Sequence, residues 1–365
     1  MKIALVSSAS THLMRWANAL SERGHDVTVI LCKNQMPYAK VKFNDSIKFV
    51  KLKFAAPLGY YLNSNQLKRV IKKGNFDIIN VHYASGYGTL ARRAKLKNAL
   101  LNIWGSDVYD FPYQSAIKMR IIKKNLKYFR YAASTSHCMA RQAKKIVDRD
   151  FYVTPFGVDT SIFKPLETVK NNEIVFGTVK TLSSKYGIAD SIKAFIKLVH
   201  RLEDEGNHEL VKALKFEIYG KGEQKDELQK LIDDNGMSDK IKLCGFVPND
   251  SLPEIINRFT IFNCNSIYNS ESFGVAAVEA MACGVAVQAS DADGFAEVVE
   301  DGVSGLLAPK GDVNIIAENM YKLLMNEDLR KKMGQAGVER VKKLYDWHDN
   351  VDLMENIYNE MIEDN

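Results

Sequence analysis

The chain is organised around the stretch Glu271-Ser-Phe-Gly-Val-Ala-Ala-Val-Glu279-Ala-Met-Ala-Cys-Gly284. An apolar run at residues 259–265 precedes it and predicts a buried strand. Gly284 is typical of the residue that follows the end of a helix. The small residues between these two points predict a helix that other elements can approach closely on several sides.

Two carboxylates and a helix start make this stretch a candidate site. Glu279 lies among apolar residues in the predicted helix, where a buried carboxylate is costly unless a partner such as a bound polyol hydrogen-bonds to it. Free backbone N–H groups at residues 273–275 favour an anion such as phosphate. Together with Glu271 in the preceding loop, they predict a site for a phosphate-linked sugar. The alternative is a core helix in which Glu279 reaches solvent or a lysine.

Length and composition indicate a soluble protein with more than one core. A chain of 365 residues suits two domains of roughly 150–200 residues each. No apolar run approaches the roughly 20 residues that a membrane-spanning helix needs. Five scattered cysteines without a CxxC pair predict reduced core residues in a cytoplasmic protein.

Charge is divided unequally along the chain. Residues 1–170 contain 29 basic and 10 acidic residues (+19), whereas the remainder contains 21 basic and 34 acidic residues (−13). Such asymmetry indicates different partners for the two halves. An anionic membrane surface or a polyanionic acceptor suits the first half. No nucleic-acid-binding motif accompanies the charge, so we expect no nucleic-acid partner.

The first half alternates apolar strands with helices. A strand at 2–7, a helix at 11–23 and a strand at 26–32 predict a parallel sheet covered on both faces. The turn at 7–10 lacks the glycines of a dinucleotide-binding loop, so we assign no dinucleotide there. Further strands are expected at 47–54, 77–83, 99–104 and 131–136.

Residues 115–130 combine six basic residues with apolar residues at helical spacing. The pattern fits a basic amphipathic helix that lies on anionic lipid. It fits equally a helix that packs its apolar face on the sheet and exposes a basic face to water. Prolines and a glycine then interrupt the periodicity at 154–165, as is typical of a linker.

The second half begins with a strand at 173–179 and a loop that carries Lys180 and Lys185. Two lysines in a strand-to-helix loop can both reach one pyrophosphate and neutralise the charge that grows as a diphosphate leaves. An ordinary exposed basic loop is the alternative. No cluster of Asp, Glu and His has the spacing of metal ligands, so we expect no metal.

The Glu-x7-Glu spacing of residues 271–279 closely resembles the donor-binding motif of the retaining, nucleotide-sugar-dependent glycosyltransferases of family 4. The PFGVD and F-x-P residues at 154–165 resemble that family's domain junction. The resemblance implies the GT-B fold, an α/β architecture of two Rossmann-like domains with parallel sheets facing across a cleft. It places an acceptor domain at 1–160, a nucleotide-sugar domain at 161–345 and, at 346–365, a helix that returns to the first domain.

The resemblance also implies roles for individual residues. Lys180 (an arginine in most relatives) and Lys185 would stabilise the leaving diphosphate, Glu271 would bind donor-sugar hydroxyls, and Glu279 would bind the ribose. The full donor set is Lys180, Lys185, Val247, Glu271, Ser272, Phe273, Gly274, Val275 and Glu279. Trp104, Ser106 and Asp107 are implied acceptor residues. Because Trp104 occupies the place of a histidine found in many relatives, His12 and His82 are added as candidates.

The implied reaction is retaining transfer of a hexosyl or N-acetylhexosaminyl group from a UDP-, GDP- or ADP-sugar to an acceptor hydroxyl. The expected acceptor is a glycan or a lipid-linked glycan of bacterial surface-polysaccharide or glycolipid synthesis, at the inner face of the plasma membrane, with peripheral contact to anionic lipid. A GT-B phosphorylase or a nucleotide-sugar epimerase would keep the fold and change the reaction. A non-catalytic binding subunit and a basic RNA- or membrane-binding scaffold are alternatives from other classes.

Overall fold

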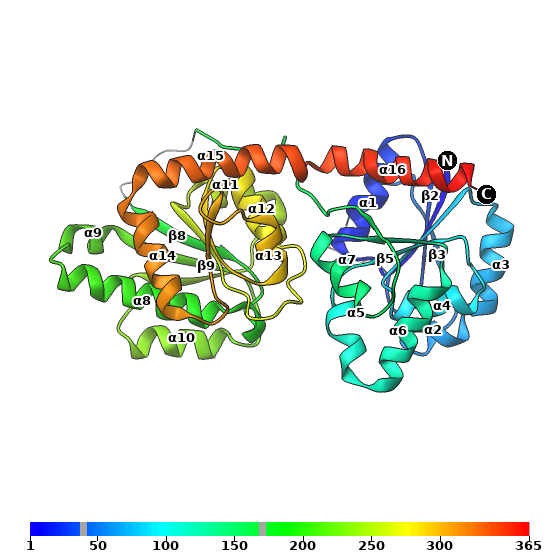
Figure 1. The fold of residues 1–365 in the computed structure, drawn as a ribbon, viewed down its shortest axis with the longest axis horizontal. Coiled ribbons are helices and arrows are strands. Elements are labelled where there is room, and N and C mark those ends of the chain that lie inside the picture. Colours follow the sequence, from blue (N-terminus) through cyan, green and yellow to red (C-terminus); the bar gives the residue numbers. More distant parts are fainter. Residues whose placement is uncertain (37–41, 168–172, 365) are drawn as a thin grey trace. The chain divides into compact units, whose positions relative to one another are not determined.

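The computed structural model describes residues 1–36, 42–167 and 173–364, which form two compact units (Figure 1). Unit 1 comprises Met1–Phe156 and His348–Asn365, and unit 2 comprises Gly157–Trp347. The sequence-based boundaries were 160 and 345. Within the described residues, no helix combines the length and the apolar character needed to cross a bilayer.

Unit 1 is built on a seven-stranded parallel sheet in the order β3-β2-β1-β4-β5-β6-β7. Its strands are β1 (Lys2–Val6), β2 (Asp26–Leu31), β3 (Lys48–Lys51), β4 (Ile78–His82), β5 (Leu100–Ile103), β6 (Tyr131–Ser134) and β7 (Tyr152–Val153). The strand order reverses between β1 and β4, and crevices at the carboxyl end of such a reversal are where open α/β sheets bind ligands.

Helices cover the sheet of unit 1 as the apolar strands require. They are α1 (Thr11–Glu22), α2 (Gly59–Leu62), α3 (Ser64–Gly74), α4 (Gly86–Arg93), α5 (Ser106–Tyr109), α6 (Ala116–Tyr128), α7 (His137–Lys144) and α16 (Trp347–Glu363). In α6, Ile122 and Leu126 are buried in the core, whereas Lys123, Lys124 and Lys127 are exposed. The helix therefore packs on the sheet through Ile122 and Leu126, whereas Ile117 at its start is 68% exposed, and contact of α6 with anionic lipid stays a prediction.

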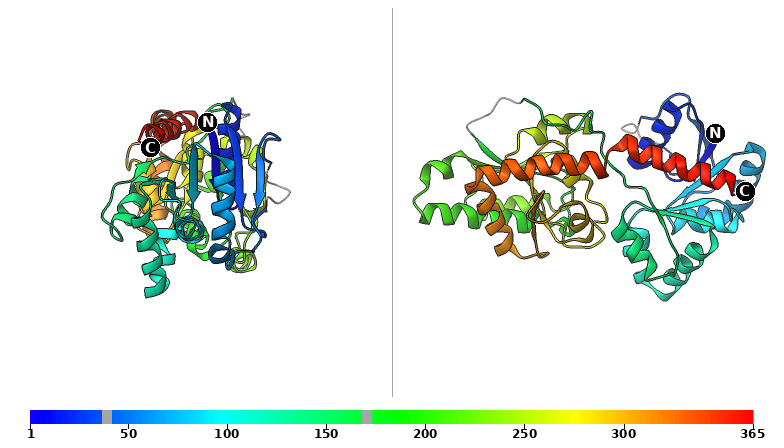
Figure 2. Two further views of the ribbon diagram at one scale, coloured as in Figure 1. Left: turned by 90° about the vertical axis from the view of Figure 1, so that its right-hand side faces the viewer. Right: turned by 45° about the horizontal axis from the view of Figure 1, so that its top comes forward.

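The C-terminal helix α16 packs on unit 1, as the fold class predicts (Figures 1 and 2). Tyr358 is fully buried, and its hydroxyl accepts a hydrogen bond of 2.6 Å from the side chain of Asn80 in β4. Glu355 pairs with His25 at 2.5 Å and also with Arg23. Residues 348–365 contain six acidic residues and no lysine or arginine, so charge complementarity adds to the apolar packing.

Unit 2 contains a six-stranded parallel sheet in the order β10-β9-β8-β11-β12-β13. The strands are β8 (Ile174–Val179), β9 (Leu214–Tyr219), β10 (Ile241–Gly245), β11 (Ile261–Cys264), β12 (Ala286–Ser290) and β13 (Gly305–Ala308). The helices are α8 (Ile188–Asp204), α9 (His208–Ala213), α10 (Lys225–Asp234), α11 (Leu252–Asn257), α12 (Val275–Ala282), α13 (Asp293–Val298), α14 (Val313–Met325) and α15 (Glu327–Leu344).

The core of unit 2 fixes the position of the strand ends. Phe176, Phe195 and Phe216 are fully buried and contact one another, with ring centroids 5.4 Å apart in both neighbouring pairs. Burying each of these rings stabilises the fold by roughly 1.5–3 kcal/mol. The strand order reverses between β8 and β11, so the loops that follow these two strands border the expected ligand crevice. The prediction of two α/β domains with parallel sheets is confirmed.

Candidate functional site

Lys180 and Glu271 meet at the strand-order reversal of unit 2. Lys180 follows β8 directly, and Glu271 lies in the loop between β11 and α12. The Lys180 ammonium and the Glu271 carboxylate form an ion pair of 2.5 Å, and Ser266 donates a hydrogen bond of 3.1 Å to the same carboxylate oxygen. The two side chains are only 21% and 11% exposed, so the pair is largely removed from water.

The ion pair keeps Lys180 charged. Burial by itself lowers the pKa of this ammonium, but the attraction and hydrogen bond of Glu271 outweigh burial and raise the pKa above its usual value. Cys264, buried at the end of β11, has a raised pKa because of burial and is a neutral thiol. Lys180 is therefore a stable cation, and the neighbouring Cys264 is not a thiolate.

Lys185 lies close to Lys180 through a shared aromatic neighbour. The ammonium groups of Lys180 and Lys185 lie 4.5 Å and 4.7 Å from the centroid of the Tyr186 ring. The backbone N–H of Ile267, in the loop after β11, donates a 2.9 Å hydrogen bond to the Lys185 carbonyl and ties the two loops together. The structure thus gathers the two predicted cations at one place.

The N-terminus of α12 borders the same loops. Its N-cap residue, Gly274, has a φ of 85°, and no side chain caps the helix. A Cβ at Gly274 would lie 2.6 Å from the Phe295 ring, so both the conformation and the packing require glycine. No acidic residue occupies the first turn, and Val275 is half-buried there, so the helix start is suited to an anion. Ser272 and Phe273 are buried in the loop before it.

Glu279 is half-buried, and the prediction that it is embedded in the core is wrong. The buried face of α12 is formed by Ala277, Val278 and residues 280–282. Glu279 shares the partly exposed strip with Val275 and Ala276, as the helical period dictates. Burial, with Glu279 nearby, raises the pKa of the Cys283 thiol to about 12.

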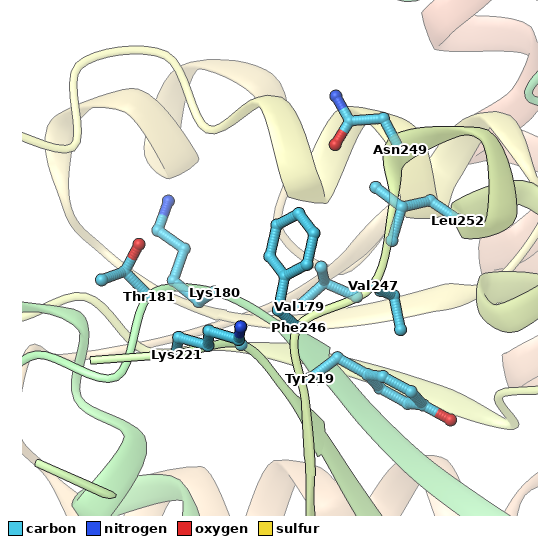
Figure 3. Close-up of a pocket in the computed structure, with 10 residues that line it drawn as sticks. Val179, Lys180, Thr181, Tyr219, Lys221, Phe246, Val247, Asn249 and Leu252 are labelled. Atoms are coloured by element: carbon cyan, nitrogen blue, oxygen red, sulfur yellow. The ribbon is translucent and has the colours of Figure 1, made fainter. Parts of the chain in front are cut away.

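A pocket of about 330 Å³ lies at the carboxyl ends of β8, β9 and β10 (Figure 3). Lys180, Lys221, Phe246 and the predicted donor residue Val247 line it. The Lys221 ammonium lies 5.4 Å from the centre of the Phe246 ring, and Figure 3 shows Phe246 extending to the same side as Lys180.

Lys221 and Phe246 were missed by the sequence analysis. The signal for Lys221 was the Gly220-Lys-Gly222 turn. Gly220 has a φ of 154°, and a Cβ there would lie 1.8 Å from the carbonyl oxygen of Lys180, so this turn packs directly against the Lys180 loop. Phe246 gave no signal because an aromatic residue at a strand end reads as core, whereas it is 46% exposed.

The acceptor candidates lie together in unit 1, at the carboxyl ends of β1, β4 and β5. His82 ends β4, and its ring lies 4.5 Å from that of Trp104, which follows β5. His12, at the start of α1, lies 5.9 Å from Trp104 and stacks on Phe156 at 4.0 Å. Among the described residues, neither histidine has a hydrogen-bond partner for its Nδ1.

Both histidines are neutral at pH 7. Burial, with a smaller contribution from Arg15, lowers the pKa of His12 to about 4, and burial lowers the pKa of His82 to about 3. The carboxyl edge of unit 1 therefore carries two neutral imidazoles, the buried His82 and the half-buried His12, beside the half-buried Trp104.

The structure gives Asp107 a place in the turn instead of the predicted contact with an acceptor. Asp107 is fully buried, and its carboxylate accepts hydrogen bonds from the backbone N–H groups of Ala84, Trp104 and Gly105 at 2.8–3.1 Å. Burial raises the pKa of Asp107, and these amide hydrogen bonds oppose the rise. Ser106 is half-buried and bonds the Tyr83 hydroxyl at 2.8 Å.

Across residues 1–36, 42–167 and 173–364, no group of three or more His, Cys, Asp or Glu side chains could hold a metal ion. Lys180 and Lys185 place two positive charges beside Tyr186. The donor candidates lie in unit 2 and the acceptor candidates in unit 1.

Comparisons with known proteins identify the family of the chain. The family model for group 1 glycosyl transferases matches residues 159–340, and a glycosyl transferase 4-like model matches residues 2–136. N-acetyl-alpha-D-glucosaminyl L-malate synthase of Bacillus anthracis is 23% identical over 369 residues, which cover 94% of this chain and 92% of that protein. Phosphatidyl-myo-inositol mannosyltransferase of Mycolicibacterium smegmatis is 25% identical over 368 residues, covering 92% and 86%.

The fold is also that of solved glycosyltransferase structures. HepE of Anabaena in complex with UDP matches with a TM-score of 0.78 at 16% identity, covering 99% of this chain and 100% of that chain. Identity this low shows the fold alone, whereas the two family models together span most of both units. The chain belongs to the group 1 glycosyltransferases of family 4 and has their GT-B fold.

Proposed function

We propose that this glycosyltransferase takes its sugar from a nucleoside diphosphate and retains the anomeric configuration. The observation that carries the proposal is the Lys180–Glu271 ion pair beside Lys185 and the uncapped start of α12. A diphosphate binds to cations and backbone N–H groups, and a polyol binds to a carboxylate.

In the proposed complex the ion pair opens. Lys180 turns from Glu271 to a phosphate oxygen, and Lys185 binds the same diphosphate, so that charge on the leaving group is neutralised as the glycosidic bond breaks. Glu271 is then free to accept hydrogen bonds from the sugar hydroxyls. With no residue assigned as a nucleophile, the acceptor hydroxyl attacks from the face that the diphosphate leaves, and a phosphate oxygen takes its proton.

The pocket lined by Lys221, Phe246 and Val247 is the proposed nucleoside site, because it adjoins Lys180. The half-buried Glu279 is the proposed partner of the ribose. HepE, whose solved complex contains UDP, has the same fold and supports a nucleoside diphosphate as ligand. The chemistry drawn here uses no metal or other cofactor, since the lysines supply the positive charge.

We propose a neutral sugar or lipid-linked glycan as acceptor, bound by His12, His82 and Trp104. The half-buried rings of His12 and Trp104 suit the apolar face of a sugar ring, and the buried His82 supports Trp104 from behind with its ring 4.5 Å away. The M. smegmatis relative is named for transfer to a phosphatidyl lipid, which supports a glycolipid or surface-glycan product made at the inner face of a membrane. Whether a hexosyl or an N-acetylhexosaminyl group is transferred depends on the donor.

Thermal-shift and calorimetric screening of UDP-, GDP- and ADP-sugars tests the donor. One class is expected to stabilise the protein, and adding a matching acceptor should release the nucleoside diphosphate. Nuclear magnetic resonance of the product should show the same anomeric configuration as in the donor. Binding of none of the three classes, or an inverted product, would refute the proposal.

A further inference from the structure

A second pocket, of about 510 Å³, lies on unit 1 away from the predicted substrate residues. Ser64 at the start of α3, Tyr128 at the end of α6, and Arg92, Arg93 and Lys95 at the end of α4 line it, and we call it the Arg93 pocket. α4 begins shortly after His82 and ends at this pocket. Eight helical residues span roughly 12 Å, so the Arg93 pocket is distinct from the His82–Trp104 surface.

The cations of the Arg93 pocket are anchored without being neutralised. The Nε of Arg92 donates to the side chain of the buried Asn125 at 2.7 Å, and the Nε of Arg93 donates to the carbonyl of Tyr61 at 3.3 Å. Each contact uses one of the five N–H donors of an arginine and leaves both terminal nitrogens for a ligand. In the part of the chain that the structure describes, no carboxylate forms an ion pair with Arg92, Arg93 or Lys95.

The neighbourhood of the pocket is uniformly basic. Residues 46–106, which include α2, α3 and α4, contain eleven lysines and arginines and a single acidic residue, Asp77. That carboxylate already accepts a hydrogen bond from the backbone N–H of Lys2. Arg92 and Arg93 interact favourably with the negative end of the α4 dipole. This interaction does not account for the third cation, Lys95, or for the pocket that the three side chains line. The three unneutralised positive charges favour binding of an anion. The planar guanidinium group can form two parallel hydrogen bonds to a phosphate.

Exposed apolar side chains lie in and next to α2, which contacts the pocket through Tyr61. Leu58, Tyr61 and Leu62, which we call the α2 apolar patch, are 68%, 43% and 54% exposed. The Arg93 guanidinium lies 5.8 Å from the Tyr61 ring, and Ser64 follows Leu62 by two residues. A soluble phosphate compound leaves this patch in water, whereas a lipid covers it and supplies the phosphate.

We propose that the Arg93 pocket binds the phosphate of an anionic phospholipid while Leu58 and Leu62 enter the acyl-chain boundary, so that unit 1 docks on a membrane through α2, the start of α3 and the end of α4. The proposal specifies the membrane contact inferred above and rests on that part of the proposed function. It places the contact at α2 instead of α6, whose Ile122 and Leu126 are buried in the core.

Sedimentation of the full chain with phosphatidylcholine vesicles, with and without phosphatidylglycerol, tests the proposal. Binding is expected only with phosphatidylglycerol. The Arg93→Gln/Lys95→Gln variant changes two exposed side chains, leaves the Arg92–Asn125 contact intact and should bind about tenfold more weakly. The control Lys72→Gln/Lys73→Gln removes the same charge from exposed positions at the other end of α3 and should bind less than about threefold more weakly.

The apolar patch gives an independent arm. Leu58→Ser/Leu62→Ser leaves the charge unchanged and should also bind about tenfold more weakly. Equal losses of vesicle binding in the Arg93→Gln/Lys95→Gln variant and its control would show that only the overall charge matters. That result would refute the Arg93 pocket as a binding site. Unchanged binding of the Leu58→Ser/Leu62→Ser variant, or absent binding of the wild type, would refute the proposal that the ligand is a membrane phospholipid.

Two further measurements separate the remaining outcomes. If calorimetry detects glycerol phosphate binding that requires Arg93 and Lys95 while vesicles do not bind, the pocket serves a soluble phosphate compound and the lipid proposal is wrong. The donor-sugar thermal shift should be the same in wild type and in Arg93→Gln/Lys95→Gln. Vesicle binding without any donor shift would refute the proposed donor and leave the docking site standing.

Discussion

The carboxyl edges of the two parallel sheets carry opposite chemistry. In unit 2 the edge holds Lys180, Lys185 and Glu271, and the pKa of Lys180 is raised by its partner. In unit 1 the corresponding edge holds neutral His82 beside Trp104. The same topology thus offers a charged ligand site in one unit and an uncharged aromatic surface in the other.

The net charge of each unit is opposite to what the chemistry of its sheet edge suggests. Unit 1 carries 27 basic and 14 acidic residues (+13), and unit 2 carries 23 basic and 30 acidic residues (−7). The cationic site lies in the acidic unit, and the neutral site lies in the basic unit. The comparison teaches that the charge of a domain reports on its outer surface, whereas a few loops at strand ends determine the charge that a substrate meets.

The largest effect is expected from Lys185→Ala and Glu271→Ala. Each should lower kcat by about 10²–10³-fold, because each removes a group that meets the diphosphate or the sugar in the transition state. Lys193→Ala on α8 removes the same charge as Lys185→Ala from a side chain that is 50% exposed, and it should retain full activity. Steady-state rates and thermal unfolding check the set. Full activity of either site variant would break the comparison, because the charged edge would then have no catalytic part.

A double-mutant cycle at Lys180 and Glu271 sharpens the contrast. Lys180→Met alone leaves a largely buried carboxylate without its cation and should destabilise the protein. Adding Glu271→Gln should recover about 1–2 kcal/mol of the loss in urea-induced unfolding. Additive effects of the two substitutions would show that the ion pair makes no net contribution.

The neutral edge should appear in the pH dependence of stability. The pKa of His82 falls from 6.5 to about 3 on folding, so the unfolded chain takes up a proton that the folded chain does not as the pH drops below 6.5. Its contribution to stability is complete above that pH and is lost as the pH falls towards 3. His82→Leu should therefore show a shallower decline in unfolding free energy between about pH 6.5 and pH 4.5. A slope equal to that of wild type would mean that His82 is protonated in the folded protein.

The smallest effect is expected at Lys221. Lys221→Ala should weaken nucleoside diphosphate binding about threefold, because this exposed ammonium lines the pocket without a carboxylate partner among the described residues. Lys225→Ala, four residues further on and also exposed, is the matched control. Calorimetry measures both, and equal affinities in the two variants would place the nucleoside elsewhere.

The gathering of Lys180, Lys185 and Glu271 could be predicted because strand-end loops at a strand-order reversal must meet. The sequence shows which residues follow apolar strands, and the parallel topology brings the loops after β8 and β11 to the same edge of the sheet. The depth of Glu279 could not be predicted in this way, because a short helix of small residues has no clear apolar face to orient it. The structure shows that residues 275, 276 and 279 share the partly exposed strip.

Other features carry no periodic signal at all. Asp107 was an acceptor candidate because its segment resembles that of family 4, yet its carboxylate accepts hydrogen bonds from three backbone N–H groups. The α2 apolar patch belongs to a four-residue helix, too short for any hydrophobic period. Residues 115–130 had such a period, and Ile122 and Leu126 of α6 prove to be core, although Ile117 is 68% exposed. Periodicity identifies helices that pack, so exposed apolar residues on short helices escape it.

The attachment of α16 to unit 1 has a consequence for biosynthesis. Asn80, in the middle of the first sheet, donates a hydrogen bond to Tyr358, which lies 278 residues later in the chain. Unit 2 is complete in the sequence at Trp347, before the ribosome has made the helix that unit 1 needs. The domain whose synthesis begins first is therefore the one that can finish folding last, and a nascent chain stalled before α16 would leave the side-chain NH2 group of Asn80 without the Tyr358 hydroxyl.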